Sequence, residues 1–392
     1  MYIKRNIEFI IKKTIKNIPI IGITGPRQSG KTTLVKHLFP KYKYISLENP
    51  DNRDFAINDP KNFLATYNNK IIFDEIQRVP ELFSYIQEVI DTDNFSGRYI
   101  LTGSNNFLLM EQISQTLAGR IILFNLLPFS YSELSNSKFK NLNIDDIIYH
   151  GLYPRCYDTN ISTELFFQTY INTYIERDVR QLKNISNLLL FQKFIKLCAA
   201  RIGKELNQTS LGNEIGVDHK TVNAWFSILE ASYILYKLPP YYKNINKRLI
   251  KSPKIYFYDT GLVCSLLGLK TIEHLKTHYL YGELFENFVI NELTKYYLHS
   301  GFNSELFFLK DKTGHEIDCV IDSPNSFIAI EIKSGSTVSD AYFKNLKYYS
   351  ELNDGKTKNN FVVYSGIENQ SRQHGKIINW KNLPNIFKII RK

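Results

Sequence analysis

Short apolar runs that lead into polar residues set the pattern of the first third of the chain. Such runs occupy much of residues 18–23, 71–75 and 98–105. Apolar runs of roughly four to eight residues predict strands that are buried on both faces, as in a parallel sheet. The sequence therefore predicts an α/β domain in which the carboxyl ends of these strands meet at one edge, where ligands bind in open sheets.

A helical pattern replaces the short runs in the middle of the chain. Residues 208–215 and 219–229 have helical periodicity, Gly216 separates them, and Asp218 is placed to cap the second helix. This pattern predicts a helix-turn-helix. The second helix has an apolar face, and its polar face carries His219, Lys220, Asn223 and Ser227. The basic segment that follows is expected to form the β wing of a winged-helix domain.

The last third begins with an amphipathic helix over residues 282–293 and then turns to strands. Strands are expected over residues 306–310, 316–321, 327–332 and 360–364. Residues two apart on a strand point to the same side, so Glu331 and Lys333 share a face.

Residues 25–32, called the phosphate loop below, fit the pattern G-x-x-x-x-G-K-[ST] at every fixed position. The glycines let backbone N–H groups surround phosphates, Lys31 reaches the β and γ oxygens, and the Thr32 hydroxyl can bind Mg²⁺. The following helix directs its N-terminal dipole at the anion. We expect the chain to bind a nucleoside triphosphate, ATP, through Gly25, Pro26, Arg27, Gln28, Ser29, Gly30, Lys31, Thr32 and Thr33.

Two carboxylates at the end of the second strand indicate the other half of this site. Asp74, 43 residues after Lys31, is expected to hold Mg²⁺, and Glu75 to act as the general base on the attacking water. Taken alone, the two acids also suit a solvated strand end. After the third strand, Ser104 or Asn105 is expected to orient the attacking water. The alternative is that each of these residues belongs only to a polar turn that follows the strand.

Composition narrows the class of protein. The 392 residues predict about two to four domains, and 43% hydrophobic with 14% aromatic residues excludes a disordered chain. No apolar run approaches the roughly 20 residues of a membrane span, and the N-terminal residues lack a secretory pattern. Four scattered cysteines without a C-x-x-C pair indicate neither a zinc site nor disulfides. We expect a cytoplasmic protein.

The net charge of +11 is concentrated in the middle of the chain, where residues 136–274 carry 18 basic against 12 acidic residues. No acid occurs between Glu230 and Asp259, and tyrosines alternate there with basic residues. The basic residues are Lys237, Lys243, Lys247, Arg248, Lys251 and Lys254. This stretch favours contact with a DNA backbone. A solvated basic face, or packing of the winged helix on a neighbouring domain, is the alternative.

Acidic residues and a lysine converge in the predicted C-terminal strands. Asp318 on one strand would lie beside Glu331 and Lys333 on the next, and Glu286 on the helix adds a third carboxylate. Carboxylates bind Mg²⁺ or Mn²⁺, and a lysine can position a water or stabilise phosphate charge. In residues and strand order the segment resembles the PD-(D/E)xK nuclease fold. The resemblance implies that the metal ligands are Glu286, Asp318 and Glu331. It implies that the catalytic residues are Glu331 and Lys333.

Nearly the whole chain resembles predicted bacterial and archaeal AAA+ ATPases that carry a winged helix and a C-terminal domain related to restriction-type nucleases. The resemblance rests on residues 25–33, 73–75, 101–104, 117–120, 128–130, 174–179 and 282–293, with Asp318, Glu331 and Lys333. It implies an αβα ATPase core over residues 1–135 and a helical lid over 136–185. The resemblance then implies a winged helix over residues 186–274 and a nuclease-like domain over 275–392.

The resemblance also suggests Arg120 and Arg177 as arginine finger or sensor, with an ion pair as the alternative for each. A double glycine and an acid are expected around Pro154, but Leu152 and Arg155 stand there. Two hypotheses remain open at this stage. In one, ATP hydrolysis is coupled to metal-dependent DNA processing. In the other, the ATPase is a switch or scaffold whose C-terminal domain only binds DNA or protein. Separately, self-association is expected, because an arginine from a neighbouring copy would complete the nucleotide site.

Overall fold

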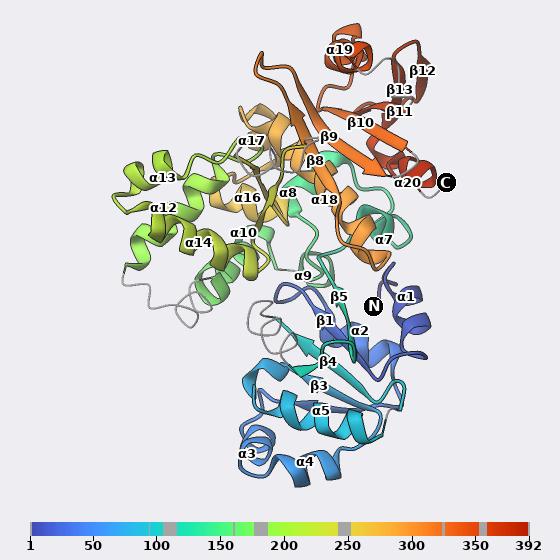
Figure 1. Cartoon of the computed structure of the whole chain (residues 1–392). Helices are drawn as coiled ribbons and strands as arrows, with labels where there is room; N and C mark the ends of the chain where they lie inside the picture. Colours follow the sequence, from blue (N-terminus) through green and yellow to red (C-terminus); the bar gives the residue numbers. More distant parts are fainter. Residues whose placement is uncertain are drawn as a thin grey trace.

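The computed structural model describes residues 2–93, 95–104, 116–159, 161–175, 187–241, 252–323, 326–352 and 359–390. The first domain is built on a five-stranded parallel sheet (Figure 1, blue to cyan). Its strand order is β2-β3-β4-β1-β5. The strands are β1 (Ile20–Thr24), β2 (Lys43–Ser46), β3 (Ile71–Asp74), β4 (Tyr99–Gly103) and β5 (Ile121–Asn125). The three strands expected from the apolar runs are therefore present.

Alternate strand residues pack on opposite faces of this sheet. Ile21 and Ile100 join the core formed with α1 (Glu8–Thr14) and α2 (Lys31–Leu38). Ile20 and Leu101 join the core on the other face. That face is covered by α3 (Pro50–Asn58), α4 (Pro60–Thr66) and α5 (Leu82–Thr92). The result is a three-layer αβα arrangement around a parallel sheet, as the sequence predicts.

The middle of the chain is mainly helical. Its first helices are α7 (Tyr131–Ser135), α8 (Ile144–His150), α9 (Arg155–Asp158) and α10 (Thr163–Tyr170), which continues into η2 (Ile171–Ile175). Then follow α12 (Leu188–Ala199), α13 (Gln208–Ile215), α14 (His219–Ala231), β6 (Leu235–Leu238), β7 (Lys254–Phe257), α16 (Thr260–Leu266) and α17 (Ile272–Thr277). The expected helix, glycine turn and second helix are present as α13 and α14.

Local chemistry explains this turn. Gly216 ends α13 with a φ of 84°, a conformation that glycine adopts without steric cost. The Asp218 carboxylate then accepts from the Thr221 backbone N–H and caps α14. The segment expected as the wing, with Lys243, Lys247, Arg248 and Lys251, lies outside the described residues.

The C-terminal part combines one long helix, α18 (Tyr281–His299), with a six-stranded sheet (Figure 1, orange to red). The strand order is β12-β13-β11-β10-β9-β8. These strands are β8 (Leu306–Lys310), β9 (Glu316–Ser323), β10 (Ser326–Lys333), β11 (Asn359–Tyr364), β12 (Gln370–Arg372) and β13 (Gly375–Asn379). They are accompanied by α19 (Lys344–Leu352) and α20 (Pro384–Ile390). All four strands expected here are present.

One hydrophobic core runs through the middle and C-terminal parts. It includes Phe129, Phe167, Phe226 and Phe288 and extends to Phe387. The helices α8 to α10, the α13–α14 helix pair and the C-terminal sheet are therefore packed as one continuous body, and movement in one of them must be accommodated by the others. Among the described residues, each helix is too short or too polar to cross a lipid bilayer.

Candidate nucleotide-binding site

The phosphate loop connects β1 to α2 at the carboxyl edge of the parallel sheet. Gly25 and Gly30 have φ values of 146° and 93°, in the region that favours glycine. A Cβ at position 25 would lie 2.1 Å from the Leu126 carbonyl oxygen, so only glycine lets β1 pass this close to the end of β5. The glycines of the sequence pattern thus have both a conformational and a steric cause.

Side chains hold the phosphate loop from inside and from behind. The Lys31 ammonium donates to the carbonyls of Gly25 at 2.9 Å and Pro26 at 2.8 Å. The buried Arg5 guanidinium donates to the carbonyls of Ser29 at 2.9 Å and Leu127 at 2.6 Å. Sequence patterns gave no indication of Arg5, because it lies 24 residues from Ser29 in an irregular segment.

A buried carboxylate neutralises Arg5. Glu133 Oε1 lies 3.2 Å from Arg5 Nε, and both side chains are buried. Burial opposes the ionised form of Glu133, but the Arg5 charge and backbone N–H donors outweigh burial and lower the pKa of this acid. Glu133 belongs to the capping box that begins α7. The phosphate loop is therefore tied through Arg5 to the start of the helical part of the chain.

Asp74 joins three strands of the sheet to the phosphate loop. Its carboxylate accepts from the Thr32 hydroxyl at 3.0 Å and from the hydroxyls of Tyr44 and Thr102. The aspartate at the end of β3 thus lies against the hydroxyl expected to bind Mg²⁺. This carboxylate–hydroxyl pair offers the hard oxygen ligands that Mg²⁺ prefers.

Glu75 follows directly and is held in a different direction. Its φ of 57° is rare for a residue with a side chain and marks a constrained position. The carboxylate accepts from the Ser104 hydroxyl at 3.0 Å and from the Gln77 side-chain amide. Ser104 therefore orients the acid expected to act as base. Asn105 and Arg177, also named from the sequence, lie outside the described residues.

Two observations show that the phosphate loop suits a phosphate chain. Among the described residues, the buried Ser29 Oγ of the loop, a hydroxyl that can donate to a phosphate oxygen, has no hydrogen-bond partner within the protein. In addition, a cavity of about 290 Å³ opens beside the loop. Its wall includes Gly30, Thr33, Tyr2, Phe129 and Tyr157. Unsatisfied polar groups next to a concave, partly aromatic wall are typical of a ligand site.

The segment around Pro154 reaches the same cavity. Pro154 lines it together with Gly30. The backbone N–H of Leu152 donates to Asp259 at 2.7 Å, and Asp259 also accepts from Leu262 at the start of α16. A Cβ on Gly151 would lie 2.1 Å from Asp259 Oδ1. Gly151 is thus required for packing, although the neighbouring sequence departs from the expected motif.

Arg120 lies at the far end of the sheet from the phosphate loop. β1 and β5 run parallel with Ile20 beside Ile121, so Arg120 precedes β5 at the amino edge, whereas the loop leaves the carboxyl edge. Arg120 instead forms an exposed bidentate pair with Asp91 on α5. The structure therefore does not bring Arg120 to the phosphate loop of its own chain, and the ion-pair alternative describes its contacts here.

Comparison with known proteins agrees with this geometry. Residues 17–135 match the family model of an AAA domain. Two further family models, both domains of unknown function, match residues 141–273 (DUF8612) and 281–383 (DUF4143). The AAA domain match and the phosphate loop together support an ATP-binding P-loop ATPase.

Relatives are found in bacteria and archaea. The uncharacterized protein Rv2008c of Mycobacterium tuberculosis is 27% identical over 334 residues, which are 84% of this chain and 73% of that protein. The uncharacterized protein MJ1544 of Methanocaldococcus jannaschii is 26% identical over 355 residues, 79% of this chain and 74% of that protein. Among solved structures, the Walker-type ATPase of Pyrococcus abyssi is similar, with 13% sequence identity and a TM-score of 0.47. The match covers 68% of this chain and 96% of that ATPase.

A second group of charged residues lies far from the AAA domain sheet. This acidic cluster consists of Glu286 on α18, Asp318 on β9, and Glu331 and Lys333 on β10. Lys333 Nζ lies 2.5 Å from Glu331 Oε2 and 3.4 Å from Asp318 Oδ2. Asp318 Oδ2 also accepts from the Ile332 backbone N–H at 2.7 Å. The three strand residues expected to converge therefore do so.

Glu286 feels the charge of Asp318 but is paired with Lys254, a lysine of the basic stretch expected to contact DNA. Lys254 Nζ lies 3.0 Å from Glu286 Oε1 and 2.5 Å from Glu316 Oε1, and only 4% of Lys254 is exposed. Lys254 is thus an internal counter-ion and is not available to a phosphate backbone. Lys237, the other described member of the basic stretch, pairs with Glu230 at 2.8 Å.

Electrostatic crowding is the main property of the acidic cluster. Burial, together with the charge of Asp318, raises the pKa of Glu286 to about 7 and that of Glu331 to about 8. Burial opposes the charged form of Lys333, but Asp318 and Glu331 outweigh it and raise the Lys333 pKa. One ammonium cannot neutralise two buried carboxylates, so one acid retains a proton near neutral pH. Within the described ranges, no group of three or more acidic, histidine or cysteine side chains is arranged to hold a metal ion.

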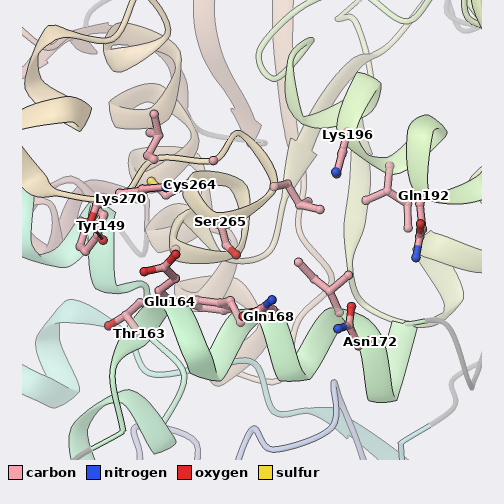
Figure 2. A pocket seen from close by; sticks show the side chains of 17 residues that line it. Tyr149, Thr163, Glu164, Gln168, Asn172, Gln192, Lys196, Cys264, Ser265 and Lys270 are labelled. Carbon is pink, nitrogen blue, oxygen red and sulfur yellow. Dashed lines mark hydrogen bonds between the residues drawn. The ribbon is translucent and has the colours of Figure 1, made fainter. Parts of the chain in front are cut away.

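A further cavity, of about 390 Å³, lies between α10, α12 and α16 (Figure 2). Its polar wall includes Glu164, Gln168, Asn172, Gln192 and Lys196. None of the sequence-predicted site residues that the structure describes lines this cavity.

Proposed function

We propose that the chain is a Mg²⁺-dependent ATPase whose nucleotide state controls its contact with DNA. The observation that carries the ATPase part is the contact between Thr32 and Asp74. It brings the hydroxyl that follows the phosphate-binding lysine to the strand-end carboxylate. Mg²⁺, when bound there by these two residues, would neutralise charge that develops on the phosphates.

The remaining steps belong to side chains of the AAA domain. Lys31 would exchange its two carbonyl partners for phosphate oxygens, a charge-assisted contact that is stronger than the bonds it replaces. Glu75, oriented by Ser104, would accept the proton of the attacking water. The cavity lined by Tyr2, Phe129 and Tyr157 would accept the base, because it adjoins Gly30 and has aromatic walls on which a planar ring can stack.

The test of the ATPase part is steady-state phosphate release by the purified chain with ATP and Mg²⁺. Turnover that is abolished by chelating the metal and by Lys31→Ala supports the proposal. Turnover that is absent in folded protein, or is unchanged in Lys31→Ala, would refute it. Lys36→Ala is the matched control, because Lys36 is an exposed lysine on the same helix, α2.

The DNA part of the proposal rests on α14. Its residues His219, Lys220, Asn223 and Ser227 are all exposed and lie on the side opposite its buried residues Val222, Phe226 and Leu229. A helix whose polar face is free after a glycine turn suits insertion into a major groove. Fluorescence anisotropy with a labelled duplex tests this part. DNA affinity that falls as salt rises and falls in Lys220→Ala supports this part. So does a difference in DNA affinity between the protein with bound ADP and the protein with a bound non-hydrolysed ATP analogue. Binding that is independent of nucleotide or absent contradicts it.

A second candidate function, metal-dependent cleavage of DNA, is favoured by the acidic cluster. Two carboxylates, Asp318 and Glu331, share one lysine, Lys333, and a divalent cation would relieve the crowding that keeps one acid protonated. Asp318 and Glu331 would hold Mg²⁺ or Mn²⁺ together with water, and Lys333 would orient a water or stabilise phosphate charge. Glu286, expected as a third ligand, is instead paired with Lys254. Nicking of circular DNA with Mn²⁺ that is lost in Glu331→Ala and Lys333→Ala supports cleavage. If the DNA stays intact under the same conditions, cleavage is refuted, and the acidic cluster has a binding or structural role.

Arg120 enters the proposal only through self-association. Because it lies at the amino edge of the sheet and is partly exposed, it would meet the nucleotide of a second copy and not its own. Size measurement with and without an ATP analogue, on wild type and Arg120→Ala, tests this role.

A further inference from the structure

A tyrosine from the helical part of the chain reaches the end of β1. Tyr233 follows α14, and its side chain is buried. Its hydroxyl lies 2.7 Å from Thr24 Oγ1 and donates to Asn125 Oδ1 at 2.7 Å. Thr24 Oγ1 in turn lies 2.6 Å from Asn125 Oδ1. Tyr233 thus bridges the carboxyl ends of the two neighbouring strands β1 and β5.

These strand ends form the base of the phosphate loop. Thr24 directly precedes Gly25, whose carbonyl holds Lys31. Asn125 directly precedes Leu126, whose carbonyl lies against Gly25 and whose N–H donates to the Thr24 carbonyl at 2.8 Å. A change in the spacing of Thr24 and Asn125 would therefore alter the position of the loop.

The backbone of Tyr233 is fixed by α14 in an unusual conformation. Its φ is 56°, which is rare for a residue with a side chain and has a steric cost. The N–H groups of Tyr233 and Ile234 donate to the carbonyls of Glu230 at 3.1 Å and Leu229 at 2.9 Å. These bonds close the last turn of α14 around Tyr233. A shift of α14 along its axis must therefore move the tyrosine that contacts β1.

We propose that Tyr233 is a positioning residue for the phosphate loop, through which the α13–α14 helix pair sets the affinity of the loop for nucleotide. The proposal rests on ATP binding by the loop, and extends it by naming the element that regulates the site. A ligand on α14 would then act on nucleotide affinity, and by linkage nucleotide would act on α14 to the same extent.

Tyr233→Phe tests the proposal, because it removes only the hydroxyl. Tyr236→Phe is the matched control, because Tyr236 is another tyrosine of this region whose hydroxyl donates to Asn291 on α18 at 2.8 Å. The first readout is hydrogen exchange of residues 24–30 in nucleotide-free protein. We expect faster exchange there in Tyr233→Phe and wild-type exchange in Tyr236→Phe. Equal exchange in all three proteins would overturn the proposal whether or not ATP binds.

The second readout is affinity for a fluorescent ATP analogue with Mg²⁺. Loss of one buried hydrogen-bonding hydroxyl is expected to weaken binding about fivefold in Tyr233→Phe, with thermal unfolding similar to that of Tyr236→Phe. The analogue should also change exchange in α14 of wild type and of the control, but not of Tyr233→Phe. An unchanged affinity, or an α14 response that survives the substitution, would contradict the coupling. Failure of wild type to bind the analogue would instead refute the proposed function, and the exchange of residues 24–30 would still decide the role of Tyr233.

Discussion

Arg5 donates to the Ser29 carbonyl across 24 residues of sequence, at 2.9 Å. This bond holds the phosphate loop from behind, and Glu133 neutralises the buried guanidinium. Arg5→Met should lower the free energy of unfolding by about 3 kcal/mol, because it leaves the Glu133 carboxylate buried without its counter-ion. Urea unfolding measures the effect, and Lys12→Met, an exposed position on α1, should change stability by less than about 0.5 kcal/mol. A loss in Arg5→Met no larger than in this control would contradict the role of Arg5.

Glu75→Gln should lower ATP turnover by about 100-fold or more, because the amide keeps the shape of the side chain but cannot accept a proton. ATP should still bind and be retained longer, since Lys31, Thr32 and Asp74 are unchanged. Rapid filtration with radiolabelled ATP measures both quantities. Glu88→Gln, at an exposed position of α5, is the control and should behave as wild type. Full turnover in Glu75→Gln would assign the base to another residue.

Gly151→Ala should destabilise the chain more than Gly268→Ala. Both glycines have positive φ, 66° and 74°, but Gly151 also has a ψ of −167°, a combination that is essentially restricted to glycine and adds a backbone cost of about 1 kcal/mol or more. Only at Gly151 does the added Cβ collide with a neighbour, the buried Asp259 carboxylate, whereas nothing lies within 4 Å at Gly268. We expect a further loss of about 1 to 3 kcal/mol at Gly151 in chemical unfolding. Equal losses would show that the segment moves freely away from Asp259.

The acidic cluster should make the chain less stable as pH rises from about 5 to about 8. The pKa of Glu331 is raised to about 8 in the folded chain by burial and by Asp318, so the folded state holds this proton more tightly than the unfolded state. The stabilisation is complete below the unfolded pKa and is lost as pH rises through the folded value, with a slope of at most about 1.4 kcal/mol per pH unit. Glu331→Gln cannot titrate and should have a shallower slope. Urea unfolding at several pH values gives both slopes, and identical slopes would exclude Glu331 as the proton site.

Local patterns predicted the parts of the fold that depend on neighbouring residues. The phosphate loop, β3 with Asp74 and Glu75, and the α13–α14 turn could be predicted because glycine conformation, strand burial and helix capping act over a few residues. The convergence of Asp318, Glu331 and Lys333 followed from strand alternation together with the pairing of two consecutive strands.

Contacts between distant segments could not be predicted in the same way. Lys254 looked like a DNA-binding residue because its neighbours in sequence are basic, yet the fold buries it between Glu286 and Glu316. Tyr233 is not singled out by any sequence pattern, and nothing in its neighbourhood indicates Thr24 as its partner. Arg120 lies beside a strand of the AAA domain sheet, but only the parallel register shows that it is at the wrong edge for its own nucleotide.

Isothermal titration of Mg²⁺ and ATP into the wild-type chain and into Lys31→Ala tests the central claim most directly. We expect wild type to bind one nucleotide per chain, and Lys31→Ala to bind at least about 30-fold more weakly, because the substitution removes a buried ammonium from the phosphates. Both proteins should unfold at similar denaturant concentrations, and Lys36→Ala should bind as wild type does. Absence of heat with folded wild-type protein, or equal affinity in wild type and Lys31→Ala, would contradict the account.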